Sequence, residues 1–206
     1  KGAEFLVFPE LFLTGFCYEP HLQSASSAED RPPYSSLSPF RALAEEHGCL
    51  IIGSIRSDRL KLGLCLDREV IDLRPKIHPF GEEREHFSGG DFISPMDTKW
   101  GRIGLQICYD LRFPEVARSL ALQGADLLVT VAQFPALRRA QWRALAVARA
   151  IENQIPHLAC NRCRGRPPGG FPPGPGELQW QSQEDGQDHE RDPEDPERRH
   201  NAIGPD

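Results

Sequence analysis

Residues 101–124 (GRIGLQICYDLRFPEVARSLALQG) constrain the fold of this chain more than any other stretch. Apolar residues at every second position from 103 to 107 predict a strand that runs directly into Cys108. After a short polar turn, Pro114 opens an apolar-periodic run that ends at Gly124, and this pattern is typical of a helix start and stop. The sequence therefore predicts a strand, a sharp turn and a helix, with a thiol at the turn.

A thiol in such a turn has a chemical use. It would lie near backbone amides and the positive end of the following helix, and both favour the thiolate. The backbone N–H of Tyr109 would then point at the oxygen of any carbonyl that the sulfur attacks. These considerations make Cys108 a candidate nucleophile. The alternative is that Cys108 is a small buried hydrophobic residue, which is the usual situation of a free cysteine.

The rest of the pattern alternates between strands and helices and predicts the α/β class. Short apolar runs predict buried strands over residues 3–8, 49–55, 125–131 and 156–161. Two further helices are expected, one over 39–47 with Ser38 as its cap and Gly48 at its end, and one over 141–154. Alternation within 62–74 predicts a hairpin that turns at 67–69, and the charged, Gly-rich stretch 80–91 is expected to be a loop.

The composition changes near residue 163. The stretch 164–206 holds 8 Pro, 7 Gly and ten acidic residues against five Arg, and it contributes −5 of the net charge of −6. The sequence thus predicts a domain over 1–162 and a tail over 163–206. The tail is either disordered, because it has too few apolar groups to form a core, or the product of a shifted reading frame in GC-rich DNA. The near-neutral body argues against a nucleic-acid-binding surface.

The chain lacks the apolar stretch of a membrane span and the features of a signal peptide. The six cysteines are scattered and show no dense framework, which is typical of reduced thiols. These features predict a cytoplasmic protein. The spacing of Cys160 and Cys163 matches a CxxC motif, but there is no second ligand pair and no preceding redox helix, so we interpret it as coincidence; a redox or zinc protein is the weaker alternative.

Two further polar residues stand at positions that favour function. Glu10 follows the first predicted strand, and the carboxyl ends of strands are where α/β sheets place functional groups. Lys76 lies between two prolines in an extended segment, and lysine is rare in this chain, with four Lys against 20 Arg. In both cases a solvated side chain is the plain alternative. A metal site built from His78, Glu82 and His86 would match no standard ligand spacing, so no metal is expected.

Five motifs occur in order: FPE at 8–10, KIHPF at 76–80, EREHF at 83–87, ICYDLRFPE at 107–115 and ARAIENQ at 148–154. Together they resemble the nitrilase, or carbon-nitrogen hydrolase, superfamily over residues 1–162. The resemblance implies an αββα four-layer sandwich that pairs with a second copy across its helices, as a homodimer or higher homo-oligomer. It also implies hydrolysis of a non-peptide C–N bond in a small amide, with no cofactor.

The resemblance assigns roles to individual positions. Cys108 would be the nucleophile, Glu10 the general base and Lys76 the oxyanion partner, with the Tyr109 N–H as a second oxyanion donor. Glu83 matches the second glutamate of the family and would orient Lys76 or the water that hydrolyses the thioester. Hydrolysis of an amide needs a nucleophile, a general base and oxyanion donors, because the amide carbonyl is a poor electrophile and ammonia is a poor leaving group.

Within the family, CYDLRFPE and the stretch 142–154 look most like omega-amidase-type enzymes, which release ammonia from monoamides of small dicarboxylates. N-carbamoyl amine or amino-acid hydrolases use the same residues and are the alternative substrate class. Arg112, just after the nucleophile, would face a substrate carboxylate, or would have a structural role.

The sequence also departs from the family pattern. We expect N-terminal and C-terminal elements of the fold to be missing, because the first strand and helix of the family should precede Lys1 and the match fades after Arg162. The hairpin is short, and Pro75 stands where a basic residue is common. The rival hypothesis is therefore a truncated, non-catalytic product that misfolds or only mediates interactions.

Overall fold

The computed structural model describes residues 2–15 and 34–162, which form two four-stranded sheets. The first sheet has the order β1-β2-β3-β4, with β1 parallel to β2 and the other pairs antiparallel. Its strands are β1 Phe5–Val7, β2 Leu50–Ser57, β3 Leu60–Leu66 and β4 Val70–Pro75. The hairpin predicted over 62–74 is thus present.

The second sheet has the order β5-β6-β7-β8, with β5 antiparallel to β6 and the remaining pairs parallel. Its strands are β5 Met96–Thr98, β6 Gly101–Ile107, β7 Leu127–Ala132 and β8 His157–Asn161. The parallel strands are nearly continuous apolar runs because both of their faces are covered.

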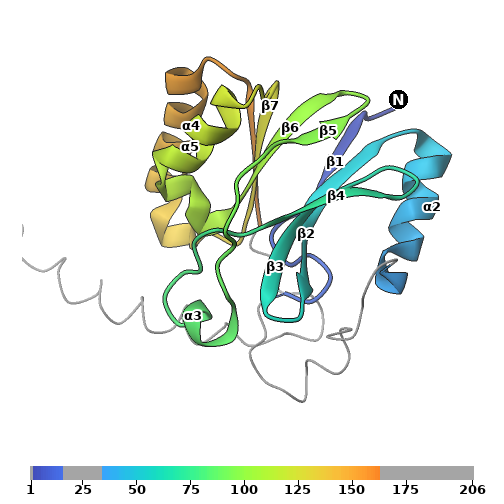
Figure 1. Cartoon of the computed structure of the whole chain (residues 1–206), viewed down its shortest axis with the longest axis horizontal. Helices are drawn as coiled ribbons and strands as arrows, with labels where there is room; N and C mark the ends of the chain where they lie inside the picture. The colour runs from blue at the N-terminus through green and yellow to red at the C-terminus, as the bar shows by residue number, and fades with distance from the viewer. Residues whose placement is uncertain (1, 16–33, 163–206) are drawn as a thin grey trace, which may run out of the picture. The chain divides into compact units, whose positions relative to one another are not determined.

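Helices cover the outer face of each sheet, which gives the four layers α, β, β and α (Figure 1). Helix α2 (Ser38–His47) packs on the first sheet, and α4 (Pro114–Leu122) and α5 (Arg139–Asn153) lie on the second. Shorter helical elements are α3 Glu83–His86 and the 3₁₀ turns η1 Ser35–Leu37, η2 Cys108–Arg112 and η3 Ala136–Arg138. The predicted αββα sandwich is confirmed.

The main apolar core lies between the two sheets and has contributions from both. Leu50, Ile52 and Cys65 of the first sheet pack in one buried cluster with Ile103, Val129 and other side chains of the second. Two smaller clusters fill the spaces beneath α2 and beneath α4. Because the sheets are held face to face, residues at the ends of strands in one sheet can meet residues of the other.

Two local expectations were wrong, and one strand was not predicted. Residues 83–86 form the short helix α3 within the expected loop, and the Phe87 N–H closes it on the Glu83 carbonyl at 2.7 Å. Strand β5 was missed because it has only three residues and is held by pairing with β6. The N-cap of α2 is Leu37, since Ser38 already belongs to the helix after the turn η1.

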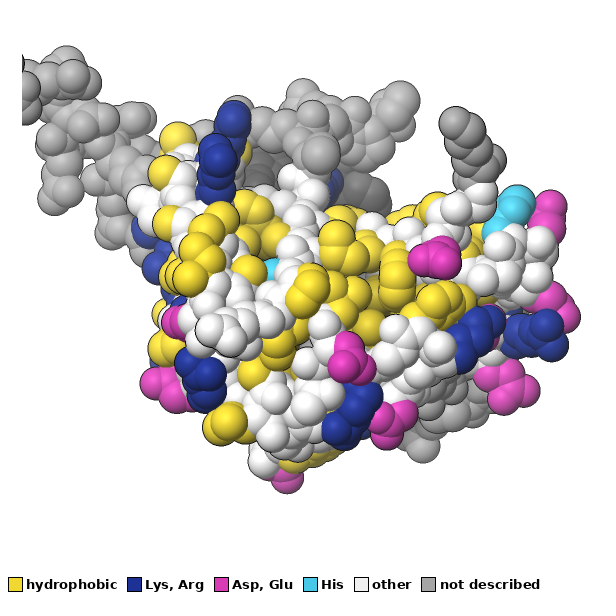
Figure 2. All heavy atoms as spheres, turned by 90° about the horizontal axis from the view of Figure 1, so that it is seen from above, with side chains coloured by type: hydrophobic (Ala, Val, Ile, Leu, Met, Phe, Trp, Pro, Cys, Tyr) yellow, Lys and Arg dark blue, Asp and Glu magenta, His cyan; other side chains and the backbone are white. Residues whose placement is uncertain are grey.

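The predicted tail 163–206 and the CxxC cysteine Cys163 lie outside the described residues. Within the described ranges, none of the helices is both long and apolar enough to cross a bilayer. Figure 2 shows one face on which hydrophobic side chains gather in a band and charged side chains of both signs are scattered around it. That face therefore carries no continuous basic surface.

The close approach of α4 to β6 depends on Gly104. A Cβ at this position would lie 3.1 Å from the Cβ atoms of both Leu120 and Ala125, and 2.9 Å from Leu128 Cδ2. We expect Gly104→Ala to lower the free energy of unfolding by about 1–3 kcal/mol, as overpacking of a buried site does. Urea denaturation measures this. Gly2→Ala, where no atom lies within 4 Å of the added Cβ, is the control, and equal stability of the two variants would contradict the packing account.

Candidate active site

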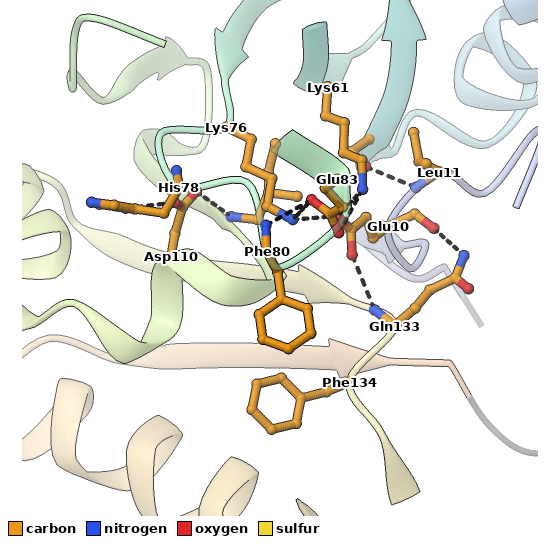
Figure 3. Close-up of polar contacts among 12 residues, drawn as sticks. Glu10, Leu11, Lys61, Lys76, His78, Phe80, Glu83, Asp110, Gln133 and Phe134 are labelled. Carbon is orange, nitrogen blue, oxygen red and sulfur yellow. Dashed lines mark hydrogen bonds and ion pairs between the residues drawn. The ribbon is translucent and has the colours of Figure 1, made fainter. Parts of the chain in front are cut away.

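Four charged side chains from separate elements meet between the two sheets (Figure 3). Glu10 follows β1, Lys61 is the second residue of β3, Lys76 directly follows β4 and Glu83 opens α3. Their exposed fractions are 0% for Glu10, 1% for each lysine and 3% for Glu83. The structure thus brings together three residues that the sequence predicted, and it adds Lys61.

Each lysine bridges both carboxylates. Lys76 Nζ lies 2.9 Å from Glu10 Oε1 and 2.8 Å from Glu83 Oε2. Lys61 Nζ lies 3.1 Å from Glu10 Oε1 and 2.9 Å from Glu83 Oε1. Two ammonium groups and two carboxylates therefore form one buried network in which every charge has two opposite partners, which buried charges require.

Backbone groups fix the two carboxylates in place. The Gln133 N–H donates to Glu10 Oε2 at 3.4 Å, and the Gln133 side-chain amide donates to the Glu10 carbonyl at 2.7 Å. The Phe80 N–H donates to Glu83 Oε2 at 3.2 Å. Leu11, the residue after Glu10, has a φ of 49° and donates its N–H to Ser54 Oγ at 2.8 Å. Glu10 is thus held by the second sheet as well as by its own.

Cys108 lies at the predicted sharp turn. It follows β6 directly, opens the 3₁₀ turn η2 and has a φ of 50°, in the left-handed region that non-glycine residues rarely adopt. Its side chain is buried and donates a hydrogen bond to the Glu10 carboxylate. The turn therefore aims the thiol at the charged network, and α4 follows from Pro114 as predicted.

One buried carboxylate ties this turn to the segment after Lys76. Asp110 accepts hydrogen bonds from the Ile107 N–H at 3.2 Å and from the His78 N–H at 2.8 Å. The His78 ring nitrogen Nδ1 lies 3.0 Å from the same carboxylate. On the other side of the turn, the buried Arg149 donates from Nε to the Leu111 carbonyl at 3.1 Å. Asp110 and Arg149 were both missed, because in the sequence they look like solvated residues of a turn and a helix.

The network determines the charge of each group. Burial by itself would raise the pKa of Glu10, but Lys61, Lys76 and the hydrogen bonds outweigh it and lower that pKa to about 2. Burial would lower the pKa of Lys76, yet the negative charge of Glu10 and its neighbours raises it above the usual lysine range. The resting site therefore contains an ionised Glu10 and a charged Lys76.

The protonation state of the Cys108 thiol differs from the expectation. Burial, together with the negative charge of Glu10, raises the pKa of Cys108 well above its usual range. The prediction that the turn favours the thiolate was wrong at rest, because these two effects are larger than the attraction of the lysines. Cys108 consequently needs a base to become nucleophilic, and the Glu10 carboxylate is in contact with it.

The remaining predicted residues, Tyr109 and Arg112, belong to the same turn η2 as Cys108. Tyr109 is the second residue of η2, where a backbone N–H has no partner within the turn. Its ring packs at 4.8 Å from that of Phe80. Arg112 lies with its guanidinium 5.4 Å from the centre of the Phe134 ring and 6.0 Å from that of Tyr109.

The structure does not assemble the alternative metal site from His78, Glu82 and His86. Among residues 2–15 and 34–162, no three His, Cys, Asp or Glu side chains form a group that could hold a metal ion. His78 instead contacts Asp110 and stacks on the ring of Phe113, with 3.6 Å between the ring centres.

Comparison with known proteins places this chain in a family. The family model described as carbon-nitrogen hydrolase matches residues 1–190. The chain belongs to the carbon-nitrogen hydrolase family. The boundary predicted at residue 162 stays a prediction.

Relatives in this family carry amidase names. The 2-oxoglutaramate amidase of Bacillus subtilis is 34% identical over 177 residues, which cover 82% of this chain and 66% of the relative. The structure resembles that of Nit3 of Saccharomyces cerevisiae, an omega-amidase and member of branch 10 of the nitrilase superfamily, with a TM-score of 0.68 and 28% identity over 79% of this chain and 63% of that one.

A second similar structure is a mutant of the amidase from Nesterenkonia sp. AN1, which shows the result of Michael addition of acrylamide at the active site cysteine. Its TM-score is 0.66, with 27% identity over 78% of this chain and 66% of that one. The chain spans 62–66% of the length of the first curated relatives it matches.

Because the pKa of Glu10 is lowered, the free energy of unfolding depends on pH in the acidic range. A carboxyl with a folded-state pKa of about 2 and an ordinary value of 4.5 contributes stability above pH 4.5, and this contribution is lost as the pH falls towards 2. We expect Glu10→Gln to reduce the pH dependence of the free energy of unfolding in this window, by up to about 1.4 kcal/mol per pH unit. Urea denaturation at a series of pH values measures it.

Glu45→Gln, at an exposed position of α2, is the matched control and should keep the wild-type pH dependence. If Glu10→Gln and Glu45→Gln unfold with the same pH dependence, Glu10 is not the strongly paired carboxylate described above.

Proposed function

We propose that this chain is a thiol-dependent amidohydrolase of the omega-amidase type, which cleaves the terminal amide of a small carboxylic acid and releases ammonia. The observation that carries the proposal is the contact between the Cys108 thiol and a buried Glu10 carboxylate that is itself bonded to Lys76. The amidase names of its relatives and the acrylamide adduct on the active site cysteine of the Nesterenkonia amidase support it.

In the first half-reaction, Cys108 Sγ attacks the amide carbonyl carbon while its proton passes to Glu10. The negative charge moves to the carbonyl oxygen, where Lys76 Nζ and the Tyr109 N–H are the proposed donors. Each such donor contributes about 3 to 4 kcal/mol to transition-state stabilisation in comparable sites. The tetrahedral intermediate then collapses, its C–N bond breaks, Glu10 gives the proton to the departing nitrogen, and ammonia leaves an acyl thioester on Cys108.

In the second half-reaction, water attacks the thioester carbonyl carbon and Glu10 accepts a proton from the water. The C–S bond breaks as the proton returns to Cys108 Sγ, which yields the carboxylic acid and the original enzyme. Glu83 keeps Lys76 in position through the 2.8 Å contact between its Oε2 and Nζ. The net reaction is amide plus water to acid plus ammonia, with no cofactor in either step.

Arg112 supports the proposed substrate class. Arg112 is four residues after Cys108 in the sequence, and its guanidinium lies near the rings of Tyr109 and Phe134. Within the described part of the chain, Arg112 makes no ion pair with a carboxylate. A guanidinium in this place suits the free carboxylate of a dicarboxylate monoamide. N-carbamoyl compounds would use the same four residues, so they belong in the same substrate panel.

Replacement of Cys108 tests the reaction. We expect Cys108→Ala to abolish ammonia release from monoamides of dicarboxylic acids, because the thioester cannot form. Ammonia is measured with the purified chain on a panel of simple amides, dicarboxylate monoamides and N-carbamoyl compounds. Cys49→Ala, at a buried position packed beneath α2, is the control and should lower stability while activity remains. Ammonia release that survives in Cys108→Ala, or silence of the wild-type chain across the panel, would contradict the proposal.

Replacement of Arg112 tests the substrate class. We expect Arg112→Met to lower kcat/KM for a dicarboxylate monoamide by about 10- to 100-fold, the effect of losing a hydrogen bond to a charged group. A simple amide of similar length, which has no carboxylate, should lose much less. Arg143→Met, at an exposed position of α5, should change neither. An equal loss on both substrates would give Arg112 a structural role.

The homodimer or higher homo-oligomer and the cytoplasmic location stay predictions from the sequence. Size-exclusion chromatography with light scattering would test the first of these directly.

A further inference from the structure

The mechanism above has no role for Lys61. This side chain is 1% exposed and reaches both carboxylates, at 3.1 Å from Glu10 Oε1 and 2.9 Å from Glu83 Oε1. Its ammonium also lies 4.8 Å from the centre of the Phe87 ring. Burial lowers the pKa of Lys61 below the usual lysine range, and the negative charges of Glu10 and Glu83 act in the opposite direction. Lys61 therefore depends on these two carboxylates to keep its charge.

The charges in the site balance only if Lys61 is counted. The groups that face Glu10 are Lys61 from β3, Lys76 after β4, the Cys108 thiol from η2 and the Gln133 amide after β7. Glu83 from α3 shares both lysines. Among residues 2–15 and 34–162, the two carboxylates and two ammonium groups of the network give no net charge, and without Lys61 these described groups would carry one unbalanced negative charge.

The balance also matters during the reaction, so this inference rests on the proposed function. When Cys108 attacks, its proton neutralises Glu10 and a negative charge appears on the substrate oxygen. Lys76 must then donate to that oxygen while Glu83 still needs a positive partner. Lys61, 2.9 Å from Glu83, can supply that partner without moving.

We propose that Lys61 is the charge-balancing residue of this site, a positioning residue that pairs with both Glu10 and Glu83 and leaves Lys76 available to the oxyanion. It acts through the carboxylates and has no contact with the reacting carbonyl. Lys61 is far from Cys108 in the sequence. It is nevertheless next to Lys76, because β3 pairs with β4 and the Lys76 N–H donates to the Lys61 carbonyl at 2.8 Å. The two lysines therefore enter the site side by side.

The test is the pH dependence of Cys108 alkylation by iodoacetamide, followed by mass spectrometry of the peptide that contains Cys108. No substrate is turned over, so the result does not depend on the amidase assay. In Lys61→Met, loss of a nearby positive charge should increase the proton affinity of Glu10 and of the thiol. We expect the rate profile to move to higher pH by about 1–3 units, the range for loss of one close charge partner.

A double variant separates charge from packing. Lys61→Met combined with Glu83→Gln removes one charge of each sign, so the profile should return most of the way to that of the wild type. Glu83→Gln alone leaves an excess positive charge and should move the profile to lower pH. Lys99→Met removes an exposed lysine that pairs with Asp67 at 2.8 Å, and it should leave the profile unchanged.

The proposal is overturned if folded Lys61→Met keeps the wild-type profile, or if the double variant stays displaced as far as the single one. If Lys61→Met does not fold, Glu83→Gln decides alone, because a profile that stays in place or moves to higher pH contradicts charge balance. A displaced alkylation profile in a chain that releases no ammonia would uphold the role of Lys61 in charge balance and reject the amidase proposal.

Discussion

The network of two carboxylates and two lysines between the sheets is the interaction on which the rest of the site depends. Charges buried this deeply are tolerated only when each has close opposite partners and further hydrogen bonds. Here the partners come from β3, the end of β4, α3 and the segment after β1. The second sheet adds the Cys108 thiol and the Gln133 amide to this network, so the αββα core and the site are parts of one arrangement.

Backbone strain at this end of the sandwich has a consistent explanation. Leu11 and Cys108 both have a φ near 50°; Leu11 directly follows Glu10, and Cys108 directly follows β6. Such conformations persist only where the surroundings hold them. The Ser54 hydroxyl holds the first through the Leu11 N–H, and the Asp110 carboxylate holds the second through the Ile107 N–H. The strain is thus stabilised by side chains that take no part in the chemistry themselves.

Much of the fold was predictable because the buried strands and the helices have clear apolar patterns. Glu10, Lys76, Glu83 and Cys108 could be predicted through motifs that lie far apart in the chain. Lys61 could not, since a lysine beside alternating leucines looks like the solvent face of a strand. In the structure Leu62, Leu64 and Leu66 face α2, so Gly63 and Cys65 face the second sheet, and Lys61 shares that face. The burial of Lys61 therefore becomes clear only when the first sheet is seen packed against the second.

The same reason explains the wrong expectation about the thiolate. The turn at Cys108 is a local feature that the sequence predicts. The desolvation of the thiol and the nearness of Glu10 are tertiary effects, and they dominate the protonation of Cys108. The helix α3 was not predicted for the same reason: its first residue, Glu83, is held by lysines from β3 and from the end of β4, which are tertiary contacts. Sequence patterns indicate which groups are present, whereas the charge on each group depends on what surrounds it.

The central claim is that Cys108, deprotonated by Glu10, carries the acyl group during amide hydrolysis. The most direct measurement is acid quench of the chain during turnover of an amide, followed by mass spectrometry of its peptides. We expect the peptide containing Cys108, and no other cysteine peptide, to gain the mass of the acyl group of the substrate and to lose it on treatment with hydroxylamine. An acyl group on a different residue, or ammonia release with no acyl intermediate under conditions where water attack is slowed, would contradict it.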